Sequence, residues 1–145
     1  MIAVDTNILV YAHREESAWH QKASDCIRSL AEGGTSWMIP WPCLHEFLAI
    51  VTHPRIYDPP SPIDAAIRQV EFWLASPTLV VAHESAAHWE TLHRLVKDAK
   101  VVGPVIHDAR VAAICLDQDV EALWSADRDF SRFSELKVRN PLVER

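Results

Sequence analysis

Short apolar runs alternate with longer stretches of helical periodicity along this chain. The runs predicted as strands are Ile2–Val4, Trp37–Ile39, Thr78–Ala82, Ala122–Trp124 and Leu136–Val138. The stretches with helical spacing cover residues 8–13, 19–31, 42–52, 63–74, 85–97 and 108–116, and a turn or short helix follows at 126–133. Because parallel strands are joined by crossover connections, usually helices, this alternation is typical of a parallel sheet covered on both faces. The sequence therefore predicts an α/β fold with a central, mostly parallel sheet of about four to five short strands, flanked by helices on both faces.

Glycines and prolines mark the breaks between these segments. Gly33-Gly34 ends the second helical stretch, residues 53–62 hold four prolines, and Gly103-Pro104 precedes the last long helix. No stretch repeats another, and 145 residues is a length typical of one compact domain. We therefore expect a single domain over residues 1–145.

Composition narrows the class of protein further. Hydrophobic residues make up 49% of the chain and charged residues 23%, as in an ordinary globular protein. No run approaches the ~18 apolar residues needed to span a bilayer, and Asp5 interrupts the N-terminal run too early for a secretory signal. The three cysteines are scattered without a Cys-x-x-Cys pair, which favours buried reduced thiols. We expect a cytoplasmic protein that does not associate with membranes.

Four carboxylates lie where a parallel sheet would bring them together. Asp5 follows the first strand, Asp127 lies just beyond the strand at 122–124, and Asp108 opens the apolar helix. The C-terminal ends of parallel strands and the adjacent helix starts share one edge of the sheet, where ligands bind. Glu46 adds a fourth carboxylate from a helix whose other face is apolar. Each of the aspartates could instead cap a helix or brace a turn, and Glu46 could simply face solvent.

Taken together, the four carboxylates indicate a metal site. They would repel one another unless a cation compensated them, and oxygen-only ligands select hard ions such as Mg²⁺ or Mn²⁺. Such a site can activate water for phosphodiester hydrolysis, with Thr6, Asn7 and Ser125 donating the hydrogen bonds that orient the carboxylates. The formal net charge of −6 disfavours binding of nucleic acid through a basic patch but is compatible with contact to phosphate through bound cations.

Histidines and tryptophans allow other interpretations. His13, His45 and His107 could act as the acid and base of a metal-independent ribonuclease, which chelation would leave active. Most of the six tryptophans are expected in the core or at interfaces, and Trp37 and Trp41, just before the Glu46 helix, are candidates for contact with a partner.

The order and context of the acids resemble one known family, the PIN domain. The resemblance rests on V-D-T-N at the first strand, Glu46 in an early helix, H-D-A-R opening the apolar helix and S-A-D-R-D-F near the C-terminus. The segments YAHREES, VTHPRIYDPP and FSRFSELKVRNPL look like those of one subgroup, the VapC-type toxins of bacterial toxin-antitoxin operons. The similarity extends over essentially the whole chain.

This resemblance implies a divalent-metal-dependent endoribonuclease that acts as a toxin. Its expected cofactor is Mg²⁺, with Mn²⁺ as an alternative, and its expected partners are an RNA substrate such as tRNA or rRNA, a cognate antitoxin protein and a second copy of the chain in a homodimer. Asp5, Glu46 and Asp108 match the core metal-binding acids, Asp127 matches the fourth, and Asp129 is a possible auxiliary. The alternative is a catalytically silent PIN-like RNA-binding or scaffold module.

Overall fold

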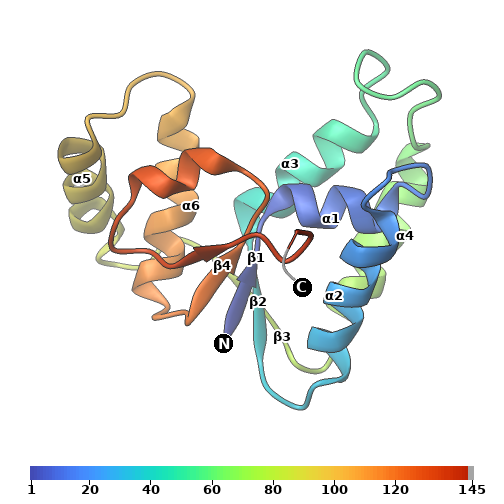
Figure 1. Cartoon of the computed structure of the whole chain (residues 1–145), viewed down its shortest axis with the longest axis horizontal. Helices are drawn as coiled ribbons and strands as arrows, with labels where there is room; N and C mark the ends of the chain where they lie inside the picture. The colour runs from blue at the N-terminus through green and yellow to red at the C-terminus, as the bar shows by residue number, and fades with distance from the viewer. Residues whose placement is uncertain (144–145) are drawn as a thin grey trace.

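A five-stranded parallel sheet organises the fold (Figure 1). The computed structural model describes residues 1–143. Its strands are β1 (Ile2–Val4), β2 (Trp37–Pro40), β3 (Leu79–Ala82), β4 (Ala122–Trp124) and β5 (Val138–Arg139). They lie in the order β3-β2-β1-β4-β5, and every neighbouring pair is parallel. The predicted α/β architecture is confirmed.

Helices connect the strands and cover the sheet. They are α1 (Thr6–His13), α2 (His20–Glu32), α3 (Trp41–Val51), α4 (Ile63–Leu74), α5 (His88–Ala99), α6 (Val105–Asp117) and the 3₁₀ helix η1 (Arg128–Arg132). Figure 1 shows α5 and α6 on one side of the sheet and α1, α2 and α4 on the other. Within the described part of the chain, no helix is both long enough and apolar enough to cross a membrane.

The central strand β1 lies between two neighbouring strands and is largely buried. Ile2 lies opposite Trp37 of β2 on one edge and opposite Ala122 of β4 on the other, and Ala3 and Val4 are fully buried. A strand that is covered on both faces shows no polar alternation, which is why a short continuous apolar run marks it in the sequence. The residue that follows β1 is therefore held in place by both neighbouring strands.

The helix that carries Asp108 begins earlier than the sequence predicts. α6 starts at Val105, with Pro104 at the N-cap position. Gly103 has a φ of 65°, a left-handed conformation that glycine adopts without strain and that reverses the chain before the helix. Proline is well tolerated at a helix start, so the helix begins at once. Asp108 thus lies within the first turn and does not cap the helix.

Two smaller expectations are also corrected. Trp37 is fully buried in β2, where its Nε1 donates a hydrogen bond to Ser76 Oγ at 3.3 Å, so it cannot contact a partner. Trp41, the first residue of α3, keeps 37% of its surface exposed. The last strand lies at 138–139 instead of 136–138, because Leu136 belongs to the preceding turn.

We expect Phe47→Ala to lower the free energy of unfolding by about 3–5 kcal/mol. The Phe47 ring is fully buried and packs edge-on against His13 and Trp73, at centroid distances of 5.3 and 4.9 Å, so it joins α1, α3 and α4. Urea unfolding measures the loss. Phe72→Ala, at a side chain that is 74% exposed, is the control and should change stability by less than about 0.5 kcal/mol. Equal losses in the two variants would contradict this description of the core.

Candidate functional site

The strand order creates a crevice at the carboxyl ends of β1 and β4. From β1 the chain proceeds outward through β2 and β3, then returns to the opposite side of β1 to form β4 and β5. In open parallel sheets, ligands bind where the strand order reverses in this way. Asp5 follows β1, and Ser125 to Asp127 follow β4. The segments after β1 and β4, which carry two of the predicted acids, therefore meet at this crevice.

The Asp5 carboxyl group is buried beneath the crevice. Asp5 occupies the N-cap position of α1, but its side chain makes no capping hydrogen bond and is only 5% exposed. Ser125 Oγ donates to its Oδ2 at 2.7 Å, and Cys43 Sγ donates to its Oδ1 at 3.5 Å. The donors come from the segment after β4 and from α3. Capping therefore does not account for Asp5, and donors from two other elements fix its position.

Thr6 and Ser125 each donate a hydrogen bond to one of the acids, whereas Asn7 contacts the loop after β4. Thr6 Oγ1 donates to Glu46 Oε2 at 3.1 Å. Asn7 Oδ1 accepts from the backbone N–H of Ala126 at 3.1 Å, and Ser125 Oγ accepts from that of Asp127 at 2.9 Å. The Thr6–Glu46 and Asn7–Ala126 bonds join residues that are 40 and 119 positions apart in the sequence. Helix α1 is thereby tied to both α3 and the loop after β4.

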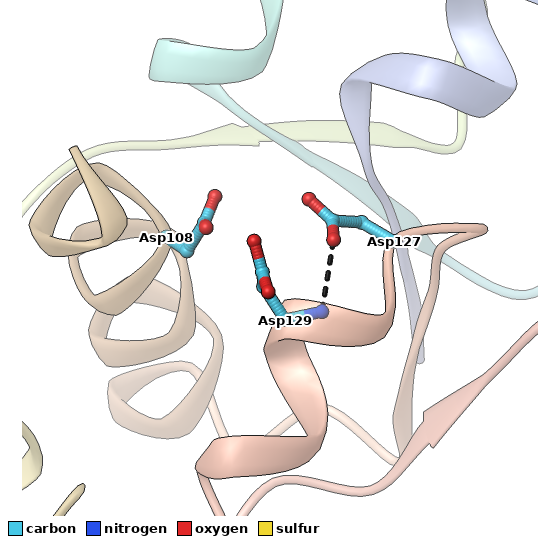
Figure 2. Close-up of side chains that lie close together, drawn as sticks. All are labelled: Asp108, Asp127 and Asp129. Carbon is cyan, nitrogen blue, oxygen red and sulfur yellow. Dashed lines mark hydrogen bonds between the residues drawn. The ribbon is translucent and has the colours of Figure 1, made fainter. Parts of the chain in front are cut away.

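Three further carboxylates converge from α6 and the start of η1. Oxygen atoms of Asp108, Asp127 and Asp129 all lie within 4.8 Å of one another, and Figure 2 shows the three groups facing a common space. Asp127 Oδ1 accepts from the backbone N–H of Asp129 at 2.9 Å, so this oxygen caps η1. The capping interpretation is thus correct for one oxygen of Asp127.

One pocket of about 200 Å³ brings together the four acids predicted from sequence. Asp5, Glu46, Asp108 and Asp127 all line it. Glu46 is exposed at its mouth, unlike the buried Asp5. Asp129 instead lines a neighbouring groove of about 550 Å³ between α3 and α6, which shares Glu46 and Asp108 with the pocket. The two hollows therefore meet at these two carboxylates.

The electrostatics of the pocket favour a bound cation. Burial, reinforced by the charges of Asp127 and Asp5, raises the pKa of Asp108 to about 7. Burial raises the pKa of Asp5 to about 6, and the Ser125 hydrogen bond opposes this rise. The ion pairs among residues 1–143 lie elsewhere, at Arg14–Glu16, Arg28–Asp25, Arg94–Glu135 and Arg110–Glu84. Clustered, uncompensated oxygen ligands fit a hard divalent ion.

The three candidate histidines do not all line one hollow. His13 lies away from the pocket and bonds through its two ring nitrogens to Gln69 and Ser61, at 3.1 and 2.9 Å, which is a structural arrangement. His45 and His107 are exposed and line the groove between α3 and α6. The hydrogen bonds of His13 leave it poorly suited to act as the acid or base of a metal-independent ribonuclease.

Sequence reasoning missed three residues of the pocket region. Cys43 precedes Glu46 by three positions, so helical spacing places both on one face of α3, but nothing identified its thiol as a donor to Asp5. Tyr11 lies one turn after Asn7 on α1, and both line the pocket. Tyr57 reaches the pocket from a proline-rich loop that has no periodic pattern.

We expect Ser125→Ala to destabilise the protein by about 1–3 kcal/mol, because the variant leaves the buried Asp5 carboxyl group without its shortest hydrogen bond. Chemical denaturation near neutral pH measures the loss. Ser134→Ala, at an exposed position, is the matched control. A loss no larger than that of the control would show that the hydrogen bond to Asp5 is dispensable for folding.

Asp108→Asn should stabilise the metal-free protein more at about pH 8 than at about pH 5. The pKa of Asp108 rises from an ordinary 3.8 to about 7 on folding, so the folded state retains a proton that the unfolded state has lost. The stability from this group is complete below pH 3.8 and disappears as the pH rises through about 7. Asparagine does not titrate, so the variant lacks this pH-dependent contribution to stability. The melting temperatures of both proteins in EDTA test this, and a difference that does not vary with pH would contradict it.

Comparison with known proteins identifies the family. Residues 2–136 match the PIN domain. The chain is 34% identical over 143 residues to ribonuclease VapC43 of Mycobacterium tuberculosis, which covers 98% of this chain and 96% of that protein. It is 31% identical over 144 residues to ribonuclease VapC33 of the same organism, with 99% and 100% covered.

Solved structures agree with this assignment at the level of the fold. A crystal structure of VapBC2 from Rickettsia felis, bound to a DNA fragment from the promoter, matches with a TM-score of 0.71 at 18% identity, over 96% of this chain and 98% of that chain. VapC20 of Mycobacterium tuberculosis matches with a TM-score of 0.66 at 21% identity, over 90% and 93%. The sequence matches and the parallel sheet agree: the chain belongs to the PIN-domain family and, within it, to the VapC ribonucleases.

Proposed function

We propose that this protein is the endoribonuclease toxin of a VapBC-type toxin-antitoxin pair and that it hydrolyses RNA with the help of a divalent ion, Mg²⁺ or Mn²⁺. The observation that carries the proposal is the convergence of Asp5, Glu46, Asp108 and Asp127 on one pocket. The relatives VapC43 and VapC33, which align over nearly the whole chain, are named ribonucleases. The family assignment and the acidic pocket of this chain support the same activity.

In this proposal all four acids contribute to binding the ion, from different positions in the pocket. Asp5, Asp108 and Asp127 are the inner ligands, and Glu46 closes the mouth of the pocket, where Thr6 orients its carboxylate. Asp129 supports the site from the groove side, since its carboxylate is close to those of Asp108 and Asp127. When bound, a hard divalent ion lowers the pKa of a coordinated water and stabilises the negative charge that develops on phosphate oxygens.

The rigidity of the surrounding elements favours precise positioning of these ligands. Asp5 is fixed between Ser125 and Cys43. Asp108 lies in the first turn of α6, and the buried residues of this helix anchor it to the core. Ligands that are already oriented do not have to be ordered when substrate binds, which is the usual advantage of a site built on helices and strand ends.

The shape of the region suits a polymer. The acidic pocket and the groove between α3 and α6 meet at Glu46 and Asp108, so an extended strand can pass the carboxylates and continue on both sides. The net charge of −6 means that phosphate would be bound mainly through cations. The adjoining hollows support single-stranded segments of RNA, such as those of tRNA or rRNA, as the substrate class.

The proposal includes protein partners. A cognate antitoxin, a homodimer and a cytoplasmic location are what the VapC family assignment leads us to propose. α4 has exposed apolar side chains at Ile63, Ile67, Phe72 and Leu74, which a protein partner could cover. A silent scaffold is the competing function, and the retention of all four acids with their hydrogen-bonding partners argues against it.

Asp108→Asn should lower Mn²⁺- or Mg²⁺-dependent cleavage of total tRNA and rRNA by about 100-fold or more without unfolding the protein. The substitution removes a ligand but preserves the shape of the side chain. Cleavage is followed by gel electrophoresis of labelled RNA, with circular dichroism as the check on folding. Asp64→Asn, at an exposed aspartate of α4, is the matched control and should retain activity.

EDTA should abolish cleavage by the wild-type protein, and added Mn²⁺ should restore it. Activity that survives chelation would instead favour the metal-independent histidine chemistry. Nuclease-free protein that cleaves none of these RNAs with either metal would favour the silent scaffold.

A further inference from the structure

We propose that Tyr57, with Tyr11 beside it, forms a stacking surface for one nucleobase of single-stranded RNA next to the acidic pocket. Both tyrosines of the chain line the pocket that contains Asp5, Glu46, Asp108 and Asp127. The inference rests on the proposed ribonuclease function and adds the part of the substrate that the site would recognise besides phosphate.

The loop that carries Tyr57 is closed at its base. It follows α3, and the N–H of Ser61 donates to the carbonyl of Val51 at 2.7 Å, so the two ends of the loop meet. Within the loop, the N–H of Tyr57 donates to the carbonyl of His53 at 3.0 Å. Tyr57 therefore extends from a compact loop whose ends are anchored to α3.

Arg14 holds the Tyr57 ring from behind. The guanidinium carbon lies 4.2 Å from the centroid of the ring, in a cation–π contact. The same guanidinium donates to the carbonyl of Pro59 at 2.9 Å and to Ser61 Oγ at 3.0 Å, and the Arg14 side chain is only 11% exposed. Because Arg14 covers one face of the ring, a base would stack on the opposite face.

A buried hydroxyl ties this loop to two helices. Ser61 is buried, and its Oγ contacts His13 Nε2 of α1 as well as Arg14, while His13 Nδ1 contacts Gln69 of α4. The loop, α1 and α4 thus share one hydrogen-bonded network. This network holds Tyr57 in a defined position relative to α1, the helix that also carries Asn7 and Tyr11 into the pocket.

The carboxylates beside Tyr57 indicate which kind of ligand would stack on its ring. A polynucleotide presents an uncharged planar base beside each phosphate, and single-stranded RNA is commonly recognised by stacking of bases on aromatic side chains. The carboxylates suit a cation that can contact a phosphate, and the half-buried Tyr57 ring offers a flat surface on which an uncharged base can stack. A single-stranded ribonucleotide meets both requirements within one pocket.

The test separates stacking from attraction to the backbone. Fluorescence anisotropy measures binding of a fluorescein-labelled, mixed-sequence RNA of about twelve nucleotides and of an abasic ribose-phosphate oligomer with the same charge. Ca²⁺ is present to compensate the carboxylates, and a gel checks that the RNA remains intact. The wild-type protein should bind the base-bearing RNA about tenfold more tightly.

Substitutions of Tyr57 test whether its ring causes the preference for base-bearing RNA over the abasic oligomer. Tyr57→Phe should keep the preference, whereas Tyr57→Ala and Tyr57→Leu should reduce it to within about twofold. Leucine fills most of the space without an aromatic face, so it separates stacking from packing if the alanine variant is unstable. Trp89→Ala, at a tryptophan of α5 that is 69% exposed, is the control and should bind like the wild type.

The outcomes distinguish this inference from the proposed function. A wild-type protein that binds both oligomers equally, or a Tyr57→Leu variant that keeps the full preference, would overturn the stacking surface even if RNA cleavage is intact. Loss of cleavage in all assays with a preserved preference for base-bearing RNA would overturn the nuclease and leave the stacking surface standing.

Discussion

The rest of the site depends on the burial of one carboxyl group, that of Asp5, at the end of the central strand. A buried carboxylate is stable only with hydrogen-bond donors or a compensating cation. Ser125 comes from the segment after the neighbouring strand β4 and Cys43 from α3, and both donate to it. The parallel order, with β1 between β2 and β4, delivers these donors to one point. The same arrangement brings Glu46 and Asp127 to the pocket.

The clustered carboxylates lower the stability of the metal-free fold but create a site that can bind a cation. Asp108 and Asp5 both have raised pKa values, because burial and neighbouring negative charge disfavour their ionised forms. A chain selected only for stability would place an Arg or Lys in such a cluster, yet the ion pairs among residues 1–143 lie elsewhere. Unfavourable clusters of this kind persist where a ligand relieves them. The repulsion within the acidic pocket is therefore consistent with the proposed metal ion, which would relieve it.

Much of the fold could be predicted, because the buried strands of a parallel sheet leave a strong local pattern. The strand at 122–124 and the helix at 63–74 lie where the apolar runs and helical spacing indicated. Prediction was less accurate where a local signal was ambiguous. An aspartate at the start of an apolar stretch suggested a helix start at Asp108, but the turn at Gly103 and Pro104 begins the helix three residues earlier. Burial of Trp37 likewise depends on the sheet that covers it.

By itself, the sequence determined the alternation of strands and helices, the identity of the four acids and the resemblance to the PIN domain, because these depend on local spacing and order along the chain. Only the tertiary structure decided which groups share a hollow: Asp127 lines the pocket with Asp5, whereas Asp129 faces the adjoining groove. It also revealed the Cys43 donor and the Tyr57 ring held by Arg14. Such contacts join residues about 40 positions apart, and the sheet order that creates them is a property of the whole chain.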